Sequence, residues 1–328
     1  MPPAPHRPAE LAGQVFRGSD VVRRGLLTRH QLRGASWLRL RQDVYADARL
    51  DRDHRLACRA ALLRLPPGTL IAGPSAAHLH GVEHAAGFDD DVHVLVTGST
   101  RVDPQAGLRV HRLGAPRHAP ATFPVGGAAG RSTARYPGSP GAGSPEVGSP
   151  GAGGPAHTGP AECAWETAVW IEPFRAVGIV DTLLRRGLLG RDELAEVADR
   201  RAGWPGSRRA GWVFGLTDPA SGSPAESHLR VRLVLGGLPR PVARHPVRLG
   251  TGVVLRPGLA WPRFRVAIQY DAGRRALADR PPLGCEPLDG LVGAGWRVVP
   301  VTDHRLRRQF PAVQAEVCAA LRAGGWRP

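Results

Sequence analysis

Two residue types are missing from this chain of 328 residues: lysine and asparagine. All 44 basic residues are therefore arginine, and the formal net charge is +16. Without lysine the chain has no Schiff-base nucleophile, no phosphate-binding loop ending in Gly-Lys, and no kinase-type catalytic lysine. Without asparagine it has no acceptor for N-glycosylation. Codon bias in a GC-rich genome accounts for both absences, but the excluded chemistry stays excluded whatever the cause.

Cysteine and long apolar runs are also scarce. The four cysteines, Cys58, Cys163, Cys285 and Cys318, are far apart in the sequence with no CxxC pair, which is the spacing of neither a disulfide framework nor a zinc site. No apolar run approaches the roughly 20 residues of a membrane span, and the first residues lack the apolar core of a signal peptide. We therefore expect a cytoplasmic protein with no membrane partner. Because 42% of the residues are hydrophobic, the chain can bury a sizeable core.

The arginine excess lies at the two ends of the chain. Residues 1–50 hold nine arginines against four acidic residues, and residues 217–328 hold seventeen against eight. Residues 51–216 are nearly balanced, with eighteen arginines against sixteen acids. A local arginine excess is the electrostatic footprint of a nucleic-acid surface, so we expect DNA as a partner. The alternative is a solvated arginine surface that reflects codon bias alone.

Composition and pattern divide the chain into five segments. Residues 126–160 are expected to be a disordered linker, because seventeen of these 35 residues are Gly or Pro and Gly-Ser-Pro recurs three times. Before the linker we expect a partial winged-helix-like region at 1–50 and a mixed α/β region at 51–125. After it we expect a helical region at 161–216 and a further domain at 217–328.

The segment 1–50 has the pattern of a helix–turn–helix followed by a hairpin. Asp20 to Leu32 is predicted as helix, turn and helix, with Thr28 as an N-cap and Gln31 three residues later. Trp37 to Tyr45 alternates apolar and charged residues, which predicts an arginine-bearing hairpin arm. A helix–turn–helix with a basic wing would be a winged-helix DNA reader. Only four residues separate Leu32 from Trp37, so a truncated or merely structural version remains an alternative.

The two middle segments are predicted to be mostly helical. Helices are expected at 55–65, at 75–80 with Ser75 as the cap, and at 161–171, 176–184 and 193–201, with strands at 92–96 and 108–111. His78, His80 and His84 invite a metal interpretation. Their spacing suits neither one helical face nor a tight metal site, so we expect surface or packing histidines.

The last segment, 217–328, has the clearest pattern. A helix from Pro224 to about Leu235 carries Glu226 near its positive N-terminal end. A short strand is expected at 253–255. In the following strand, Phe264, Val266, Ile268 and Tyr270 point one way, while Gln269 and Asp271 point the other. A helix near 289–292, a strand at 296–301 and a helix at 311–321 complete the order.

Several short motifs occur in this order: GLLTR at 25–29, DVYA at 43–46, SAAHLHG at 75–81, SPAESHLR at 223–230, GLP at 237–239, LAWP at 259–262, YD at 270–271 and GWRV at 295–298. Their order and spacing resemble a family of actinobacterial proteins. Those proteins join a region related to the DNA-binding domains of type IV (AbiEi) antitoxins to a domain related to very-short-patch-repair endonucleases. The resemblance covers most of the chain except the linker. It implies an α/β (α+β) fold with a restriction-endonuclease-like, PD-(D/E)XK, C-terminal domain.

The resemblance also implies a metal-dependent site, from which this chain departs. In the family a helix glutamate, a strand aspartate and a strand glutamate would hold Mg²⁺, which polarises a phosphodiester and activates water. Here the helix glutamate matches Glu226. The aspartate position is Gly258, the second glutamate position is Gln269, and Ala272 replaces the glycine after Asp271. Glu226 and Asp271 are the catalytic and metal-ligand candidates that remain.

Three functions follow from these patterns. The first is a DNA-binding protein with a degenerate, inactive endonuclease domain and no cofactor, whose antitoxin-like or regulatory role would imply a protein partner such as a toxin. The second is an active Mg²⁺-dependent DNA endonuclease in which Glu226 and Asp271, helped by Asp279, hold the metal in a shifted geometry. The third is a protein-interaction scaffold. The arginines expected to contact DNA are Arg29, Arg39, Arg41, Arg230, Arg274 and Arg275.

Overall fold

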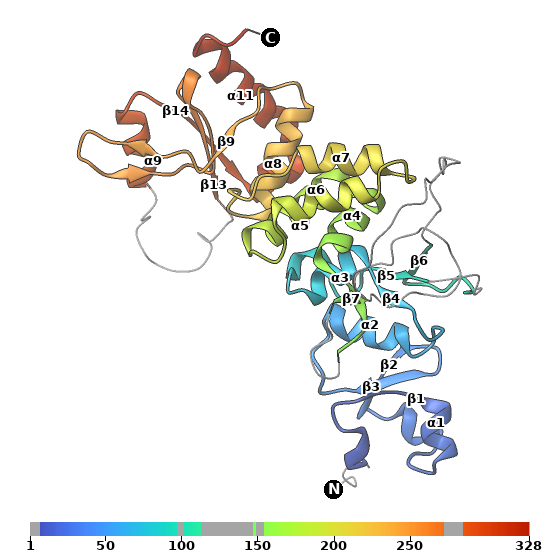
Figure 1. Ribbon diagram of the computed structural model, residues 1–328. Coiled ribbons are helices and arrows are strands. Elements are labelled where there is room, and N and C mark those ends of the chain that lie inside the picture. The colour runs from blue at the N-terminus through green and yellow to red at the C-terminus, as the bar shows by residue number, and fades with distance from the viewer. Residues whose placement is uncertain (1–6, 97–101, 113–146, 149–153, 272–284, 328) are drawn as a thin grey trace, which may run out of the picture. The chain divides into compact units, whose positions relative to one another are not determined.

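The computed structural model describes residues 7–96, 102–112, 147–148, 154–271 and 285–327 (Figure 1). Over these residues the chain has an α/β fold in which helices accompany several small sheets, as the sequence predicts. The chain divides into two compact units. Unit 1 comprises Met1–Trp170 and Leu188–Gly211, and unit 2 comprises Ile171–Gly187 and Trp212–Pro328. The segment 161–216, expected as one helical region, is therefore divided between them.

Unit 1 begins with a small antiparallel sheet and one short helix (Figure 1). Its elements are η1 (Ala9–Leu11), β1 (Val15–Arg17), α1 (Gly18–Arg23), the 3-10 turn η2 (Gln31–Arg33), β2 (Trp37–Arg41) and β3 (Val44–Asp47). The sheet order is β1-β3-β2, and the β2–β3 hairpin is the predicted arginine-bearing arm. In its turn, the carboxylate of Asp43 accepts hydrogen bonds from the N–H and hydroxyl of Ser19, at 2.8 and 2.7 Å. This contact ties the hairpin to the start of α1.

The second helix of the expected helix–turn–helix is only a turn. Thr28 and Gln31 do form the predicted capping box: Thr28 N donates to Gln31 Oε1 at 2.7 Å, and Gln31 N donates to Thr28 Oγ1 at 3.2 Å. The chain then makes η2 and enters β2 at Trp37. The prediction of a second α-helix is therefore wrong, because the capped segment has too few residues before the strand to propagate one.

The remainder of unit 1 is built around a five-stranded sheet of order β6-β5-β4-β8-β7. The strands are β4 (Leu70–Ile71), β5 (Val92–Leu95), β6 (Leu108–His111), β7 (Val147–Gly148) and β8 (His157–Thr158), and the helices are α2 (His54–Leu62), α3 (Gly73–Leu79), η3 (Glu83–Ala85), α4 (Pro160–Trp170) and α6 (Arg191–Arg200). The predicted strands at 92–96 and 108–111 are confirmed as β5 and β6. Part of the segment 126–160 forms regular structure, because β8 pairs with β4 and β7 and α4 begins at Pro160. Its residues 126–146 and 149–153 lie outside the described part of the chain.

Ser75 lies inside α3 and is not its N-cap, which corrects the sequence prediction. Its hydroxyl oxygen accepts the N–H of His93 at 2.9 Å and lies 2.8 Å from His54 Nε2. The other ring nitrogen of His54 is 2.7 Å from the carbonyl oxygen of Gly87, so Nδ1 donates there and neutral His54 accepts the Ser75 proton at Nε2. The hydroxyl of Ser75 thus donates one hydrogen bond and accepts another, which explains how Ser75 can be fully buried.

Two of the three histidines considered as metal ligands bond to backbone carbonyls. His80 Nε2 lies 2.8 Å from the carbonyl oxygen of Thr158, and His78 Nδ1 lies 3.3 Å from that of Glu83. The rings of His80 and His157 also pack edge to face, 4.7 Å apart. Each of these two rings is therefore oriented by a backbone carbonyl, and that of His80 also by a neighbouring ring.

Glu166 of α4 is fully buried and links α4 to α3. Its Oε2 accepts hydrogen bonds from Gly73 N at 2.7 Å and from Thr158 Oγ1 at 2.8 Å, while Oε1 has no partner among the described residues. Burial raises the pKa of this carboxyl to about 8. Glu166 therefore stays protonated at neutral pH, because ionising it would leave a buried charge with two neutral donors.

Unit 2 centres on a four-stranded sheet of order β14-β13-β12-β9. Its elements are α5 (Pro173–Arg185), α8 (Pro224–Leu235), β9 (Val242–Ala243), β10 (Val247–Arg248), β11 (Val254–Leu255), β12 (Leu259–Trp261), the 3-10 turn η4 (Pro262–Phe264), β13 (Val266–Asp271), α9 (Cys285–Gly293), β14 (Arg297–Thr302), α10 (Asp303–Arg308) and α11 (Phe310–Ala323), while α7 (Ser207–Gly215) has residues in both units. Strand β13 is antiparallel to β12 and parallel to β14. The predicted order of helix, strands, helix, strand and helix is confirmed, whereas α7 and α10 were not predicted.

The core of unit 2 lies between this sheet, α8 and α11. Leu229 and Leu233 of α8, Ile268 of β13 and Val317 of α11 are fully buried together. Each such side chain contributes roughly 1.5–3 kcal/mol by leaving water. The strand expected from Phe264 begins at Val266 instead, because Arg265 adopts a left-handed backbone with φ +49° after η4.

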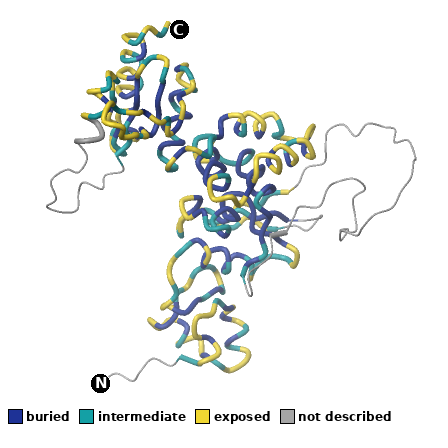
Figure 2. Tube along the Cα trace, turned by 60° about the vertical axis from the view of Figure 1, so that its left-hand side comes forward, coloured by how far each residue is buried: buried dark blue, intermediate teal, exposed yellow. Residues whose placement is uncertain are grey.

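Buried segments lie inside each unit, and the exposed segments are mostly turns and outer helix faces (Figure 2). Among the described helices, none is both long enough and apolar enough to cross a membrane.

Glu166 should make the stability of unit 1 fall as pH rises. Its ordinary pKa is 4.5 and its folded pKa is about 8, so the folded state holds the extra proton between these values. The stabilisation is complete below the ordinary pKa and is lost as pH rises through the folded pKa, by up to roughly 1.4 kcal/mol per pH unit. Burial lowers the pKa of His54, His80 and His111. These histidines therefore make stability rise with pH, and their contribution stops changing above their ordinary pKa of 6.5. Glu166 therefore dominates from about pH 6.5 to about pH 8.

Urea denaturation between about pH 6.5 and about pH 8 should show that the free energy of unfolding of the wild type falls as pH rises. The free energy of unfolding of Glu166→Gln should stay constant over this interval. The glutamine oxygen still accepts the hydrogen bonds from Gly73 and Thr158, but the side chain does not ionise. Glu196→Gln, at an exposed carboxylate of α6, is the control and should keep the wild-type slope. An unchanged slope in Glu166→Gln would contradict the assignment.

Candidate nucleic-acid interface and endonuclease-like site

Glu226 lies in the first turn of α8, where its carboxylate has a partner within the loop before the helix. Ser223 caps α8 by accepting the N–H of Glu226 at 3.2 Å. Glu226 Oε2 in turn accepts the N–H of Gly222 at 2.9 Å, and the residue is only 8% exposed. A carboxylate is stabilised at a helix N-terminus by the helix dipole. The position of Glu226 therefore has a sufficient structural cause without a metal.

Gly258 lies directly against this carboxylate. A Cβ atom placed on Gly258 would lie 3.2 Å from Cδ of Glu226 and 3.5 Å from each of its carboxylate oxygens. An acidic side chain at position 258 would therefore be in direct contact with the carboxyl group of Glu226. The structure thus brings the helix glutamate together with the position that the resemblance assigns to the strand aspartate.

Gln269 and Asp271 lie at the C-terminal end of β13, on the face opposite to that of Tyr270. All six residues of β13 pair in regular register with β14, so alternate side chains project from opposite faces. Tyr270 packs with the core that α8 covers, so Gln269 and Asp271 project from the opposite face. The structure therefore joins Glu226 with Gly258, while the two other candidate positions are not drawn into the same cluster. Ala272 and Asp279 lie outside the described residues.

Tyr270 and Asp303 join Glu226 at this end of the sheet, and the sequence patterns gave no sign of them. The hydroxyl of Tyr270 donates to Asp303 Oδ1 at 3.2 Å. Burial, the charge of Asp303 and, more weakly, the charge of Glu226 raise the pKa of this hydroxyl to about 12. Asp303 is itself paired with Arg307 at 2.7 Å. The sequence alone does not indicate this contact, because Tyr270 and Asp303 meet only when β13 and α10 are placed side by side.

These residues do not fit a divalent metal ion. Mg²⁺ is held by carboxylate oxygens and water in near-octahedral geometry. Position 258 offers no donor, Gln269 offers a neutral amide, and Asp303 is already neutralised by Arg307. Among the described residues, no group of three or more His, Cys, Asp or Glu side chains could hold a metal. No catalytic step is therefore assigned to a metal here.

The six arginines expected to contact DNA fall into three sets: exposed and unpaired, bonded within the protein, and outside the described residues. Arg29 and Arg39 are exposed, with no hydrogen bond or ion pair to the described residues. Arg33, which was not predicted, is exposed in the same way at the end of η2. By contrast, Arg17, Arg23 and Arg24 are paired with Asp43, Asp20 and Glu10. Arg274 and Arg275 lie outside the described residues.

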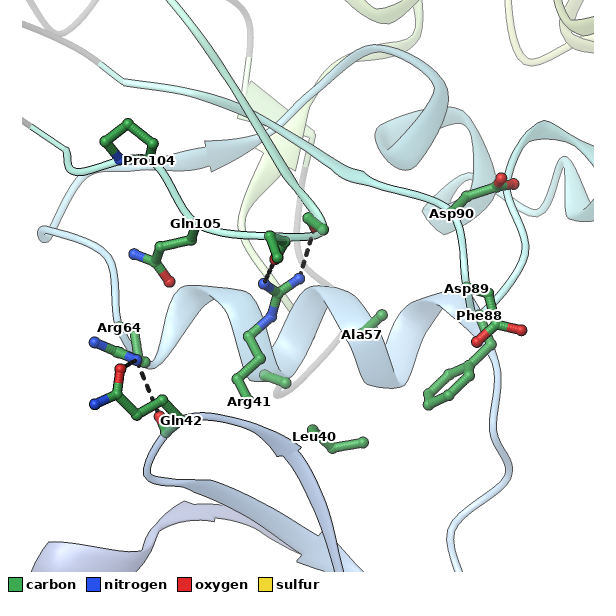
Figure 3. Close-up of a pocket in the computed structure, with 13 residues that line it drawn as sticks. Leu40, Arg41, Gln42, Ala57, Arg64, Phe88, Asp89, Asp90, Pro104 and Gln105 are labelled. Atoms are coloured by element: carbon green, nitrogen blue, oxygen red, sulfur yellow. Dashed lines mark hydrogen bonds between the residues drawn. The ribbon is translucent and has the colours of Figure 1, made fainter.

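Arg41 is engaged within unit 1, which corrects its assignment as a DNA contact. Its guanidinium donates to the carbonyl oxygens of Ala106 and Gly107 at 3.0 and 2.8 Å (Figure 3). It crosses a cavity of about 570 Å³ between α2, the hairpin and residues 104–107 (Figure 3). Burial lowers the pKa of Arg41. The half-buried guanidinium therefore fastens residues 106–107 to the hairpin, and its donors to these carbonyls are occupied.

Arg230 is also enclosed, so its assignment as a DNA contact is corrected as well. It is 1% exposed and pairs with Asp181 of α5, with Nη2 2.7 Å from Oδ2. Its other donors reach the hydroxyl of Ser221, at 3.2 Å, and the carbonyl oxygen of Leu216. A guanidinium held in this way cannot reach a phosphate. It fixes α8 against α5 and the loop that precedes α8.

Comparison with known proteins identifies distant relatives and no activity. The chain is 27% identical over 152 residues to two proteins of Mycobacterium tuberculosis, the uncharacterized protein Rv2248 of strain ATCC 25618 / H37Rv and the uncharacterized protein MT2308 of strain CDC 1551 / Oshkosh. The match covers 45% of this chain and 55% of each relative, so the chain spans about half the length of the curated relatives it matches. No family model matches the chain, and no solved structure matches it.

Replacing Arg230 should destabilise unit 2, and any loss of DNA affinity should follow from that loss of stability. Arg230→Met removes the partner of Asp181 and leaves a buried charge, which costs roughly 3–5 kcal/mol in such pairs. Adding Asp181→Leu should restore much of this loss, because the unpaired charge is then gone. Urea denaturation of the single and double variants measures both effects, with exposed Arg248→Met as the control. Weaker DNA binding by Arg230→Met at unchanged stability would restore the original assignment.

Proposed function

We propose that this chain is a DNA-binding protein whose C-terminal, endonuclease-like unit does not cleave DNA. The observation that carries the proposal is the packing of Gly258 against the carboxylate of Glu226. In the endonucleases that this chain resembles, an aspartate at that point would share a metal ion with the glutamate. Here a glycine stands in its place, and the remaining carboxylate is satisfied by the N–H of Gly222.

DNA binding is supported by the distribution of unpaired arginines in unit 1. Arg29 and Arg33 lie around the capped turn η2, and Arg39 lies in the middle of β2. Arginines that are already paired with acids gain little from a phosphate, because a carboxylate must be displaced first. Among the arginines of residues 7–47, Arg29, Arg33 and Arg39 are therefore the ones suited to the DNA backbone. A protein that binds DNA without cutting it would act by occupying its site, as a regulator or an antitoxin does.

The first test is a gel shift of duplex DNA over a range of salt concentrations. Wild-type affinity should fall as salt rises, with a slope of about −0.9 in log affinity against log salt for each phosphate contact. The combined variant Arg29→Ala, Arg33→Ala, Arg39→Ala should bind more weakly at low salt and lose about one unit of slope per arginine. The control is Arg23→Ala with Arg24→Ala, because both residues are paired with acids. Binding that ignores salt would argue against phosphate contacts.

The second test is incubation of supercoiled plasmid with Mg²⁺ or Mn²⁺. Wild-type protein should leave the plasmid intact, because Gly258 supplies no second carboxylate beside Glu226. Glu226→Ala is run beside it to recognise contamination, since a contaminating nuclease ignores that substitution. Metal-dependent nicking by the wild type that disappears in Glu226→Ala would overturn the proposal and establish an active endonuclease.

A further inference from the structure

Arg244 occupies an unusual position beside the Glu226–Gly258 contact. Its backbone is left-handed, with φ +54°, a conformation that costs an arginine on the order of 1 kcal/mol. Two hydrogen bonds hold it there. Arg244 N donates to the carbonyl oxygen of Gly258 at 3.1 Å, and its own carbonyl oxygen accepts from Arg256 Nη1 at 3.4 Å. The residue that packs against Glu226 therefore also fixes the backbone of Arg244.

The guanidinium of Arg244 and the carboxylate of Glu226 border the same small space. A Cβ atom placed on Gly222 would lie 3.0 Å from Glu226 Oε2 and 3.4 Å from Cζ of Arg244. Glu226 is buried, whereas Arg244 is exposed. Within the part of the chain that the structure describes, the guanidinium of Arg244 has neither a hydrogen bond nor an ion pair. Arg244 therefore presents unused donors to solvent, and its guanidinium and the carboxylate both border the position beside Gly222.

We propose that Arg244 stands in the electrostatic place of the missing metal, balancing the charge of Glu226 on one side and binding a phosphodiester of DNA on the other. This rests on the proposed function and names the ligand of the same site. A guanidinium has five donors in a planar fork and is always charged, so it can serve two anions at once. Unlike a metal ion, it has no coordination position for water and generates no hydroxide. The bound phosphodiester is therefore held and not hydrolysed.

Several features of the site agree with this role. Without a cation, the carboxylate of Glu226 would repel a phosphate at this point, and the exposed guanidinium of Arg244 borders the same space as that carboxylate. Arg256, which donates to the carbonyl of Arg244, holds a second exposed arginine beside it. The strained backbone is maintained by the bond to Gly258, in keeping with the clustering of such strain at functional sites.

The test compares duplex DNA binding by wild type, Arg244→Gly and Arg248→Ala, measured by fluorescence anisotropy at several salt concentrations. Glycine accepts the left-handed backbone, so Arg244→Gly removes the guanidinium without adding strain. Arg248 is an exposed arginine of β10 and serves as the matched control for net charge. We expect Arg244→Gly to weaken binding about tenfold and to lower the salt slope by about one unit, with Arg248→Ala close to wild type. Glu226→Gln should bind DNA as tightly as wild type or a few times more tightly, because the repelling charge is gone.

The outcomes separate this inference from the proposed function. If wild type binds DNA but Arg244→Gly loses no more affinity than Arg248→Ala, Arg244 is not the phosphate ligand and the proposed function stands. Weaker binding by Glu226→Gln would also overturn the inference, because it would show that the carboxylate supports binding. If wild type shows no salt-dependent binding, the proposed function itself fails.

Discussion

The arrangement of unit 2 depends on one buried ion pair, between Asp181 of α5 and Arg230 of α8. Both side chains are almost fully enclosed, at 0% and 1% exposed. Burial raises the pKa of Asp181, while Arg230, the hydroxyl of Ser227 and the N–H of Asp218 act in the opposite direction. Such a pair contributes little net stability over a well-packed apolar pair. Its value here is that all three guanidinium nitrogens and both carboxylate oxygens have defined partners, which fixes the register of α8.

That register determines where the site lies. Arg230 and Asp181 together bind the backbone of the loop before α8, through the carbonyl of Leu216 and the N–H of Asp218. The loop ends at Ser223, the cap of α8, and Glu226 follows one turn later. The carboxylate of Glu226 is thus held against Gly258 by a chain of contacts that begins in α5. A charge pair deep in the unit positions a group at its surface.

The order of elements in unit 2 could be predicted because each strand or helix is marked by local pattern. The alternation in β13 and the Ser-Pro start of α8 are signals of that kind. The enclosure of Arg230 could not be predicted, because its partner Asp181 is 49 residues away and an isolated arginine suggests a surface. The same holds for Arg41, whose acceptors are about 65 residues later in the sequence. The contact between Glu226 and Gly258 also needed the structure, since the sequence shows only that an acid is missing.

The route of the chain through the two units has a consequence for how the protein can be divided. Residues 171–187 belong to unit 2, although the residues on both sides of them belong to unit 1. A fragment that starts at Thr217, where composition suggests a boundary, would lack α5 and therefore Asp181. The face of α8 that packs against α5 would then be open to water and Arg230 would have no counter-charge, so the fragment would lack the contacts that fix α8 in unit 2. The C-terminal unit is therefore not a portable module that could be exchanged by joining segments end to end.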